Sequence, residues 1–350
     1  MDLLPGVHAD HVDARLRTHY LESGPADGEP VVLVHGNLST GRFFEHLMPG
    51  APGRWRLLAP DMRGFGRTER APIDATRGLG DWADDLVAFL NALGIEEPPH
   101  LLGWSTAGAA IALVARMRPV ASLTLLDPVS PFGYGGTFPD GTPCFLDAAG
   151  SGGGVANPGF VARLRAGDRS SDDPLSPRSV MNATYWAAGH REPPEREDVL
   201  VDELLLSVIG DDGYPGDSTP SENWPGTAPG TRGILNALSP RYCDWSWLPG
   251  LDPKPPVLWT HGDADVVVAD GSMLELGTLG AAGVVPGWPG AEVFPAQPMV
   301  SQIRTVLERY RAAGGRAETE MFPGSGHGPH VDAAEAWSRT FFGFLDSVRG

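Results

Sequence analysis

Short apolar runs without polar alternation recur along the first 130 residues, and each ends at glycine or a polar residue. Runs of this length predict strands buried on both faces of a parallel sheet. Between them, apolar residues such as Trp82, Leu86 and Phe89 recur at spacings of three and four, which predicts amphipathic helices. The expected strands are 30–34, 56–60, 100–103, 123–126, 256–260 and 317–322, and the expected helices are 82–93, 107–117, 299–313 and 332–348.

The alternation of strands and helices predicts one α/β domain with an interruption. Strand–helix–strand succession at this pace indicates right-handed crossover units and a mostly parallel sheet flanked by helices. Residues 131–249 break the rhythm, because they are rich in glycine and proline and show only separate helical stretches near 158–165, 177–188 and 195–209. We therefore expect a core formed by residues 1–130 and 250–350, with a mainly helical cap, 131–249, inserted between them.

Composition narrows the classes of partner. The chain has 26 Lys and Arg against 44 Asp and Glu, a net charge of −18, which argues against nucleic acid and against anionic membrane surfaces. No apolar stretch approaches the ~20 residues that cross a bilayer, and the first residues lack a signal-peptide pattern. We expect a soluble, cytoplasmic protein. Two cysteines, Cys144 and Cys243, are too few for a disulfide scaffold, and whether they are bonded stays open.

A serine stands at one of the predicted strand-to-helix junctions, in the sequence Gly103-Trp104-Ser105-Thr106-Ala107. Small residues two positions before and after the serine allow a tight turn that raises its hydroxyl above the sheet. The alternative interpretation is a serine that caps the helix N-terminus. The buried strand before Ser105 and the helix after it favour a nucleophile, which needs a base and a third group that orients the base.

Two loops after the later strands offer these partners. His327 lies in a glycine-rich loop after the last predicted strand, where its ring can swing toward Ser105. His330 is a rival base, although its position at the start of the last helix favours a capping or surface role. Asp263 and Asp265 follow the preceding strand and are the candidate acids.

Five short segments resemble the α/β-hydrolase superfamily, and they occur in that family's order, each at the carboxyl end of a predicted strand. They are His35-Gly36-Asn37, Asp61-x-Arg63-Gly64-x-Gly66-x-Thr68, Gly103-x-Ser105-x-Ala107, Gly262-x-x-Asp265 and Gly326-His327. The resemblance implies an α/β-hydrolase fold outside the cap. Ala107 departs from the family pattern, which has glycine there, but alanine keeps the site small.

The resemblance also implies a role for each candidate side chain. Ser105 would be the nucleophile, His327 the general base, and Asp265 the acid that orients the histidine. Asp127, at the end of an earlier strand, is the alternative acid, because some members of the family place the acid there. Asp263 is expected to brace its loop.

Backbone groups would complete the site. By the same resemblance, the N–H groups of Asn37 and Thr106 would form the oxyanion hole, although a plain turn at the strand end also fits Asn37. Residues 61–68 are expected to form a structural loop. The five candidate ligands His261, Asp263, Asp265, His327 and His330 show no metal-binding spacing, and we expect neither a metal nor a cofactor.

A serine nucleophile narrows the reaction. Ser105 cannot perform the chemistry of the related haloalkane dehalogenases, whose nucleophile is an aspartate. We expect hydrolysis of a carboxylic ester or lactone through an acyl-enzyme on Ser105. The alternatives are a cofactor-free haloperoxidase or perhydrolase, a C–C bond hydrolase and, outside catalysis, a ligand-binding receptor of the same fold.

Tryptophans suggest an apolar pocket. Trp104, Trp186 and Trp288 are the candidate lining residues, and the expected substrate is a small, moderately apolar acyl compound. The chain between Asp265 and His327 is longer than one helix and one strand require, and its surplus, 270–298, is apolar. We expect this stretch to form a second lid containing Trp288. A dimer contact or a patch packed on the core are the alternatives, and the oligomeric state stays open, with a homodimer as one option.

Overall fold

The computed structural model describes residues 3–349 and contains one eight-stranded sheet with strand order β1-β2-β4-β3-β5-β6-β11-β12. β2 runs antiparallel to both β1 and β4, and all other neighbours in the sheet are parallel. The strands are β1 (His8–Asp13), β2 (Arg17–Ser23), β3 (Glu29–Val34), β4 (Trp55–Pro60), β5 (His100–Trp104), β6 (Ser122–Leu126), β11 (Val257–Gly262) and β12 (Ala317–Phe322).

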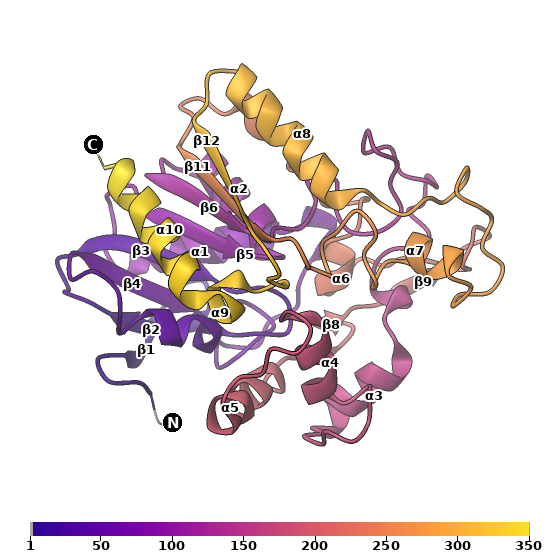
Figure 1. Ribbon diagram of the computed structural model, residues 1–350, viewed down its shortest axis with the longest axis horizontal. Coiled ribbons are helices and arrows are strands. Elements are labelled where there is room, and N and C mark those ends of the chain that lie inside the picture. Colours follow the sequence, from indigo (N-terminus) through magenta and orange to yellow (C-terminus); the bar gives the residue numbers. More distant parts are fainter. Residues whose placement is uncertain (1–2, 350) are drawn as a thin grey trace.

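Helices cover both faces of this sheet. Figure 1 shows α10 crossing in front of the strands, with α1 and α2 behind them. The helices of the core are α1 (Gly80–Ala92), α2 (Ala107–Met117), α8 (Met299–Ala312), α9 (Pro329–Asp332) and α10 (Ala334–Ser347), with 3-10 turns η1 (Gly41–Leu47) and η2 (Ala75–Arg77). The expected fold class, a mostly parallel sheet flanked by helices, is confirmed.

The N-terminal hairpin was not predicted from the sequence. β1 is exposed at nearly every position, and its residues are mainly polar. A strand that buries neither face shows no apolar periodicity, so the pattern of the sequence carries no signal for it. β1 lies at the sheet edge and pairs only with β2.

The chain between β6 and β11 is less helical than expected. Three helices lie near the expected stretches and are grouped below the sheet in Figure 1: α3 (Pro158–Ala166), α4 (Pro177–Thr184) and α5 (Pro194–Leu204). The remainder consists of loops and short elements, because glycine and proline interrupt longer periodicity. These are η3 (Gly153–Val155), β7 (Ile209–Gly210), β8 (Tyr214–Pro215), β9 (Ser218–Pro220), β10 (Thr227–Pro229), α6 (Ile234–Ala237) and η4 (Leu248–Gly250).

Two further features bear on the expectations from the sequence. Cys144 and Cys243 are free thiols. Within residues 3–349, no helix combines the length and apolar character that crossing a membrane requires.

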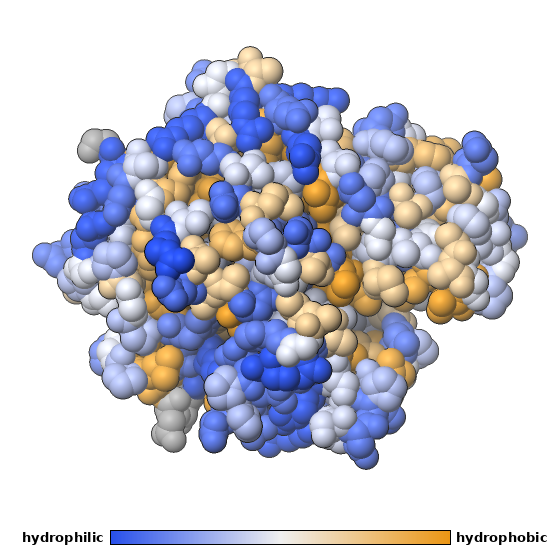
Figure 2. Space-filling view, viewed as in Figure 1, coloured by the Kyte–Doolittle hydropathy of each residue, from blue (hydrophilic) through white to orange (hydrophobic). Residues whose placement is uncertain are grey.

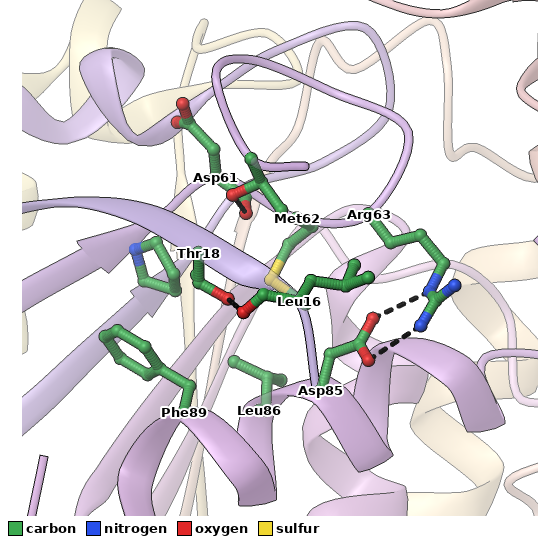
Figure 3. Close-up of a pocket in the computed structure, with 10 residues that line it drawn as sticks. Leu16, Thr18, Asp61, Met62, Arg63, Asp85, Leu86 and Phe89 are labelled. Atoms are coloured by element: carbon green, nitrogen blue, oxygen red, sulfur yellow. Dashed lines mark hydrogen bonds and ion pairs between the residues drawn. The ribbon is translucent and has the colours of Figure 1, made fainter. Parts of the chain in front are cut away.

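The loop 61–68 is held by buried polar contacts. The Asp61 carboxylate accepts hydrogen bonds from the N–H groups of Gly41 and Arg67, each at 2.9 Å. Figure 3 shows Arg63 facing Asp85 of α1, with hydrogen bonds of 2.7 and 2.9 Å between them. They border a cavity of only about 10 Å³, which none of the candidate catalytic residues lines.

Removing one partner of this buried ion pair will destabilise the protein. We expect Asp85→Ala to lower the free energy of unfolding by about 3–5 kcal/mol, because the Arg63 guanidinium then stays buried without its counter-charge. Urea unfolding measures the change. The matched control is Glu335→Ala, which breaks an exposed ion pair with Arg339 on α10 and should change stability by less than about 1 kcal/mol. Equal effects of both variants would contradict the expectation.

Candidate active site

Ser105 follows β5 directly, in a strained turn. Its φ is 55°, a left-handed conformation that is uncommon outside glycine and costs on the order of 1–3 kcal/mol. The turn is held by hydrogen bonds from the Ser105 N–H to the Leu126 carbonyl and from the Gly108 and Val129 N–H groups to the Ser105 carbonyl. A Cβ at Gly103 would lie 2.6 Å from the Ala107 carbonyl oxygen, so the turn requires glycine there.

His327 and Asp265 form a buried pair. His327 Nδ1 lies 2.8 Å from Asp265 Oδ2, and Oδ1 of the same carboxylate accepts the N–H groups of Val267 and Val268 at 2.6 and 3.1 Å. These three contacts fix the orientation of the carboxylate. The carboxylate in turn fixes the proton of His327 on Nδ1, which leaves Nε2 free to accept a proton. His327 and Ser105 line the same cavity.

The other candidate acids have different surroundings. Asp263 is exposed, and its carboxylate accepts the Gly324 N–H at 2.6 Å, which is the loop-bracing contact expected for it. Asp127 is fully buried at the end of β6, and its Oδ1 accepts the Gly262 N–H at 2.9 Å. Burial raises the pKa of Asp127 well above its usual range, and the negative charge of Asp265 raises it further.

His330 does not lie at the surface, and within residues 3–349 its ring nitrogens make no hydrogen bond, contrary to the capping or surface role expected from its place in the sequence. It is fully buried, with ring centroids 4.8 Å from that of Trp104 and 5.1 Å from that of Phe44. Burial lowers the pKa of His330 well below its usual value. His330 lies in α9, and these aromatic rings cover its side chain. The local sequence does not indicate these contacts.

The loop after β3 presents the Asn37 N–H to the cavity. The Gly36 carbonyl is held by His35 Nδ1 at 2.7 Å and by the Ser39 hydroxyl at 2.9 Å. Because a trans peptide points its C=O and N–H in opposite directions, the Asn37 N–H is directed away from these partners. His35 Nε2 accepts the Met62 N–H at 2.9 Å, so its ring carries the proton on Nδ1.

The backbone N–H groups of Asn37 and Thr106 are available to a ligand. Among residues 3–349, neither Asn37 N–H nor Thr106 N–H donates a hydrogen bond to the protein, and both residues line the cavity next to Ser105. A Cβ at Gly36 would come within 3.0 Å of the Ser105 Cβ, so glycine allows this loop to approach the serine. Two free donors beside a serine hydroxyl match the requirements of an oxyanion hole.

The cavity above Ser105 has a volume of about 450 Å³ and a mainly apolar lining. Trp104 belongs to the lining, and its indole N–H donates to the His327 carbonyl at 2.7 Å. Residues that the sequence did not single out also line it, and nothing in their local sequence separates them from core residues. They include Tyr134, Phe160, Met181, Tyr185 and Tyr214 from the segment between β6 and β11.

Trp186 and Trp288 do not line this cavity, contrary to the sequence expectation. Trp186 packs on the loop that carries His327, where a Cβ at Gly328 would meet its ring at 2.8 Å. Trp288 covers Gly280 of α7 (Leu276–Ala281) and donates to the Phe294 carbonyl at 2.9 Å. The stretch 270–298 nevertheless reaches the cavity through other side chains, namely Met273, Leu274, Glu275, Leu276, Leu279 and Val284.

Of the five candidate metal ligands from the sequence, only Asp265 and His327 belong to a group of three potential ligands among residues 3–349, and Asp127 is its third member. One oxygen each of Asp127 and Asp265 and one ring nitrogen of His327 lie within 4.8 Å of one another. The hydrogen bond between His327 and Asp265 already uses two of these three groups, and this contact favours proton transfer at the site over metal ligation.

Comparison with known proteins places the chain among relatives of this architecture. A family model described as the alpha/beta hydrolase fold matches residues 29–140. A haloalkane dehalogenase of Mycobacterium marinum is 46% identical over 110 residues, which cover 29% of this chain and 37% of the relative. A cis-3-alkyl-4-alkyloxetan-2-one decarboxylase of Xanthomonas campestris is 41% identical over 105 residues, covering 28% and 32%. The chain thus matches about a third of the length of these relatives.

A solved structure extends the likeness to nearly the whole chain. An esterase from Exiguobacterium antarcticum superposes with a TM-score of 0.60 at 17% identity, covering 97% of this chain and 100% of that one. At this identity the likeness concerns the fold. The chain thus has the alpha/beta hydrolase fold, and its residues 29–140 match the family model of that fold.

Proposed function

We propose that this protein is a serine hydrolase that cleaves a carboxylic ester or lactone through an acyl-enzyme on Ser105. The observation that carries the proposal is the meeting of three features in one cavity. These are a serine in a strained turn, a histidine bonded to a buried carboxylate, and two unpaired backbone N–H groups. Each feature supplies one requirement of acyl transfer.

The first half of the reaction forms the acyl-enzyme. His327 Nε2 takes the proton of the Ser105 hydroxyl while the serine oxygen attacks the substrate carbonyl carbon. The carbonyl oxygen becomes an oxyanion, which accepts hydrogen bonds from the backbone N–H groups of Asn37 and Thr106. Asp265 stabilises the imidazolium that forms. The imidazolium then gives its proton to the leaving alkoxide, so an alcohol departs and the acyl group stays on Ser105.

The second half returns the enzyme to its starting state. A water molecule gives a proton to His327 Nε2 and attacks the acyl carbon, which again produces an oxyanion in the same hole. Collapse of this intermediate breaks the bond to Ser105, and the proton returns from His327 to the serine oxygen. The products are a carboxylic acid and an alcohol, or a hydroxy acid when the substrate is a lactone.

The lining of the cavity supports an uncharged, apolar acyl group. Glu275 is the acidic residue of the lining, and its carboxylate is occupied by the N–H groups of Gly277 and Thr278 at 2.9 and 2.6 Å. A cavity of this size and character suits a medium-sized apolar ligand. Residues 131–249 contribute much of the lining, and on this basis we propose that they form the cap of the active site.

Apolar side chains continue from the cavity to the surface. Met273, Leu274 and Val284 line the cavity and are also 58%, 45% and 64% exposed. Figure 2 shows orange and pale orange atoms over the part of the surface where α7 lies in Figure 1. A longer acyl chain can therefore extend from the cavity over this rim while it stays in contact with apolar atoms.

The rim gives a test of acyl-chain preference. We expect Val284→Ser to raise KM for long-chain esters by about threefold to tenfold with little change in kcat, because the variant removes apolar contact present before and during the reaction. A series of p-nitrophenyl esters from acetate to longer chains measures this effect. Val293→Ser is the matched control, since Val293 is 39% exposed but outside the lining. An equal effect on acetate, or in the control, would contradict a role of the rim.

A substrate panel tests the function as a whole. Esters, lactones and amides are offered to the purified protein, with and without a serine-directed phosphonate. We expect turnover of esters or lactones that the phosphonate abolishes. Absence of turnover across the panel, together with unlabelled Ser105, would contradict the proposal and favour a ligand-binding role for the cavity.

A further inference from the structure

Four titratable side chains form a buried cluster behind the nucleophile. Asp127 follows β6, His261 lies in β11, Asp265 follows β11, and His327 follows β12. All four are at least 94% buried. Asp332 of α9 also contributes negative charge to the surroundings of Asp127. The proposed mechanism uses only Asp265 and His327, so the cluster contains a second acid and a second histidine without an assigned role.

The hydrogen bonds distinguish the two acids. Asp265 accepts three donors, namely His327 Nδ1 and the N–H groups of Val267 and Val268. Asp127 accepts only the Gly262 N–H on Oδ1. Its Oδ2 is buried and receives no hydrogen bond from any group in residues 3–349. A buried carboxylate oxygen without a donor is unfavourable, and two charged carboxylates this close repel each other.

His261 does not supply the missing donor. Its Nε2 lies 3.0 Å from the Val268 carbonyl, which can only accept, so the neutral ring carries its proton on Nε2. Its Nδ1 then has a lone pair and lies 3.4 Å from Asp127 Oδ1, the oxygen that already accepts the Gly262 N–H. Burial lowers the pKa of His261, which keeps the ring neutral. A proton on Asp127 Oδ2 would therefore remove both the repulsion between the two carboxylates and the buried oxygen without a hydrogen-bond partner.

We propose that Asp127 is a neutral carboxylic acid whose Oδ2–H donates a hydrogen bond to Asp265, and that it is a positioning residue for the His327–Asp265 pair. One oxygen of each acid and a ring nitrogen of His327 lie within 4.8 Å of one another, and Asp127 and Asp265 are close enough to interact through a side-chain hydrogen bond. The inference rests on the proposed function for its kinetic consequence, but the protonation state of Asp127 exists without turnover.

The direction of the pKa shift agrees with this geometry. Burial raises the pKa of Asp127 well above its usual range, and the charge of Asp265 acts in the same direction. A neutral Asp127 adds a donor to Asp265 without adding negative charge beside His327.

Asparagine mimics a protonated aspartate, which makes Asp127→Asn the decisive variant. Its amide NH₂ donates to Asp265, and its carbonyl accepts the Gly262 N–H. We expect kcat/KM within about threefold of the unsubstituted protein and an acid limb of the pH profile that moves by less than about 0.3 unit. Asp127→Ala removes both hydrogen bonds and should lower kcat at least tenfold. Rescue by asparagine but not by alanine separates positioning through hydrogen bonds from mere occupation of space.

An ionised Asp127 would give the opposite pH result. Its negative charge would stabilise the His327 imidazolium, so replacing it with asparagine would move the acid limb down by roughly one to two pH units. That shift, or asparagine as damaging as alanine, would overturn the inference.

Two measurements on the resting protein need no substrate. Infrared spectroscopy at pH 8 should show the C=O stretching band of a protonated carboxylic acid, and Asp127→Asn should lack it. Nitrogen NMR of the ring should show the same titration of His327 in both proteins and a neutral His261. A missing band or a cationic His261 would overturn the inference even if esters are cleaved. The band without ester turnover would contradict the proposed function alone.

Discussion

Replacing Ser105 with alanine will lower kcat by roughly four orders of magnitude or more, because the acyl-enzyme cannot form and the remaining triad members act only as a unit with the nucleophile. A fluorophosphonate probe should add one equivalent to the starting protein, on the peptide that contains Ser105. The variant should take up none. Steady-state hydrolysis of an activated ester and intact-mass spectrometry measure the two effects.

The control for this experiment is a serine outside the site. Ser171 lies in an exposed loop between α3 and α4, so Ser171→Ala should keep both turnover and labelling. Ser105→Ala should also keep its stability, since alanine retains the Cβ that the turn already accommodates. Labelling that persists in Ser105→Ala would place the nucleophile elsewhere, and unchanged kcat would remove the acyl-enzyme from the mechanism.

The strands that are buried on both faces could be predicted, because burial requires apolar residues along the whole strand. Central parallel strands are covered by helices on both faces, so they appear as largely apolar runs such as those ending at Val34 and Leu126. β1 buries neither face, and its polar sequence carries no such signal. The helical content of 131–249 was overestimated for a different reason, because its long loops are held by tertiary contacts that no local period reveals.

Candidate site residues could be named when their place follows from topology. Ser105, Asp265 and His327 each follow a parallel strand, and the carboxyl ends of such strands meet at one edge of the sheet. The surroundings of Trp186 and His330 depend instead on a glycine and on aromatic rings far away in the sequence, and Trp288 covers Gly280 of α7. No property of a tryptophan alone indicates whether its ring will face a cavity or cover a glycine.

Replacing Asp265 with asparagine should have the second largest effect, a fall in kcat of about 10³ to 10⁴ with a smaller change in KM. The Asn amide can present an N–H to His327, which favours the wrong tautomer, and it has no charge to stabilise the imidazolium. The backbone N–H groups of Val267 and Val268 can still donate hydrogen bonds to the amide oxygen, so the loop should stay folded. Circular dichroism and urea unfolding check that point.

Asp263→Asn is the matched control, because it is the same substitution two residues away on the same loop. Its Oδ1 can still accept the Gly324 N–H that the carboxylate accepts now, and its side chain is exposed, so kcat should stay within about twofold. Asp127→Asn should also be mild, for the separate reason that the acid it replaces is already neutral. The three asparagine variants therefore have a fixed order of effect, with Asp265 far ahead of the other two. A crippled Asp127→Asn beside a mild Asp265→Asn would move the catalytic acid to the end of β6, one strand earlier in the sheet.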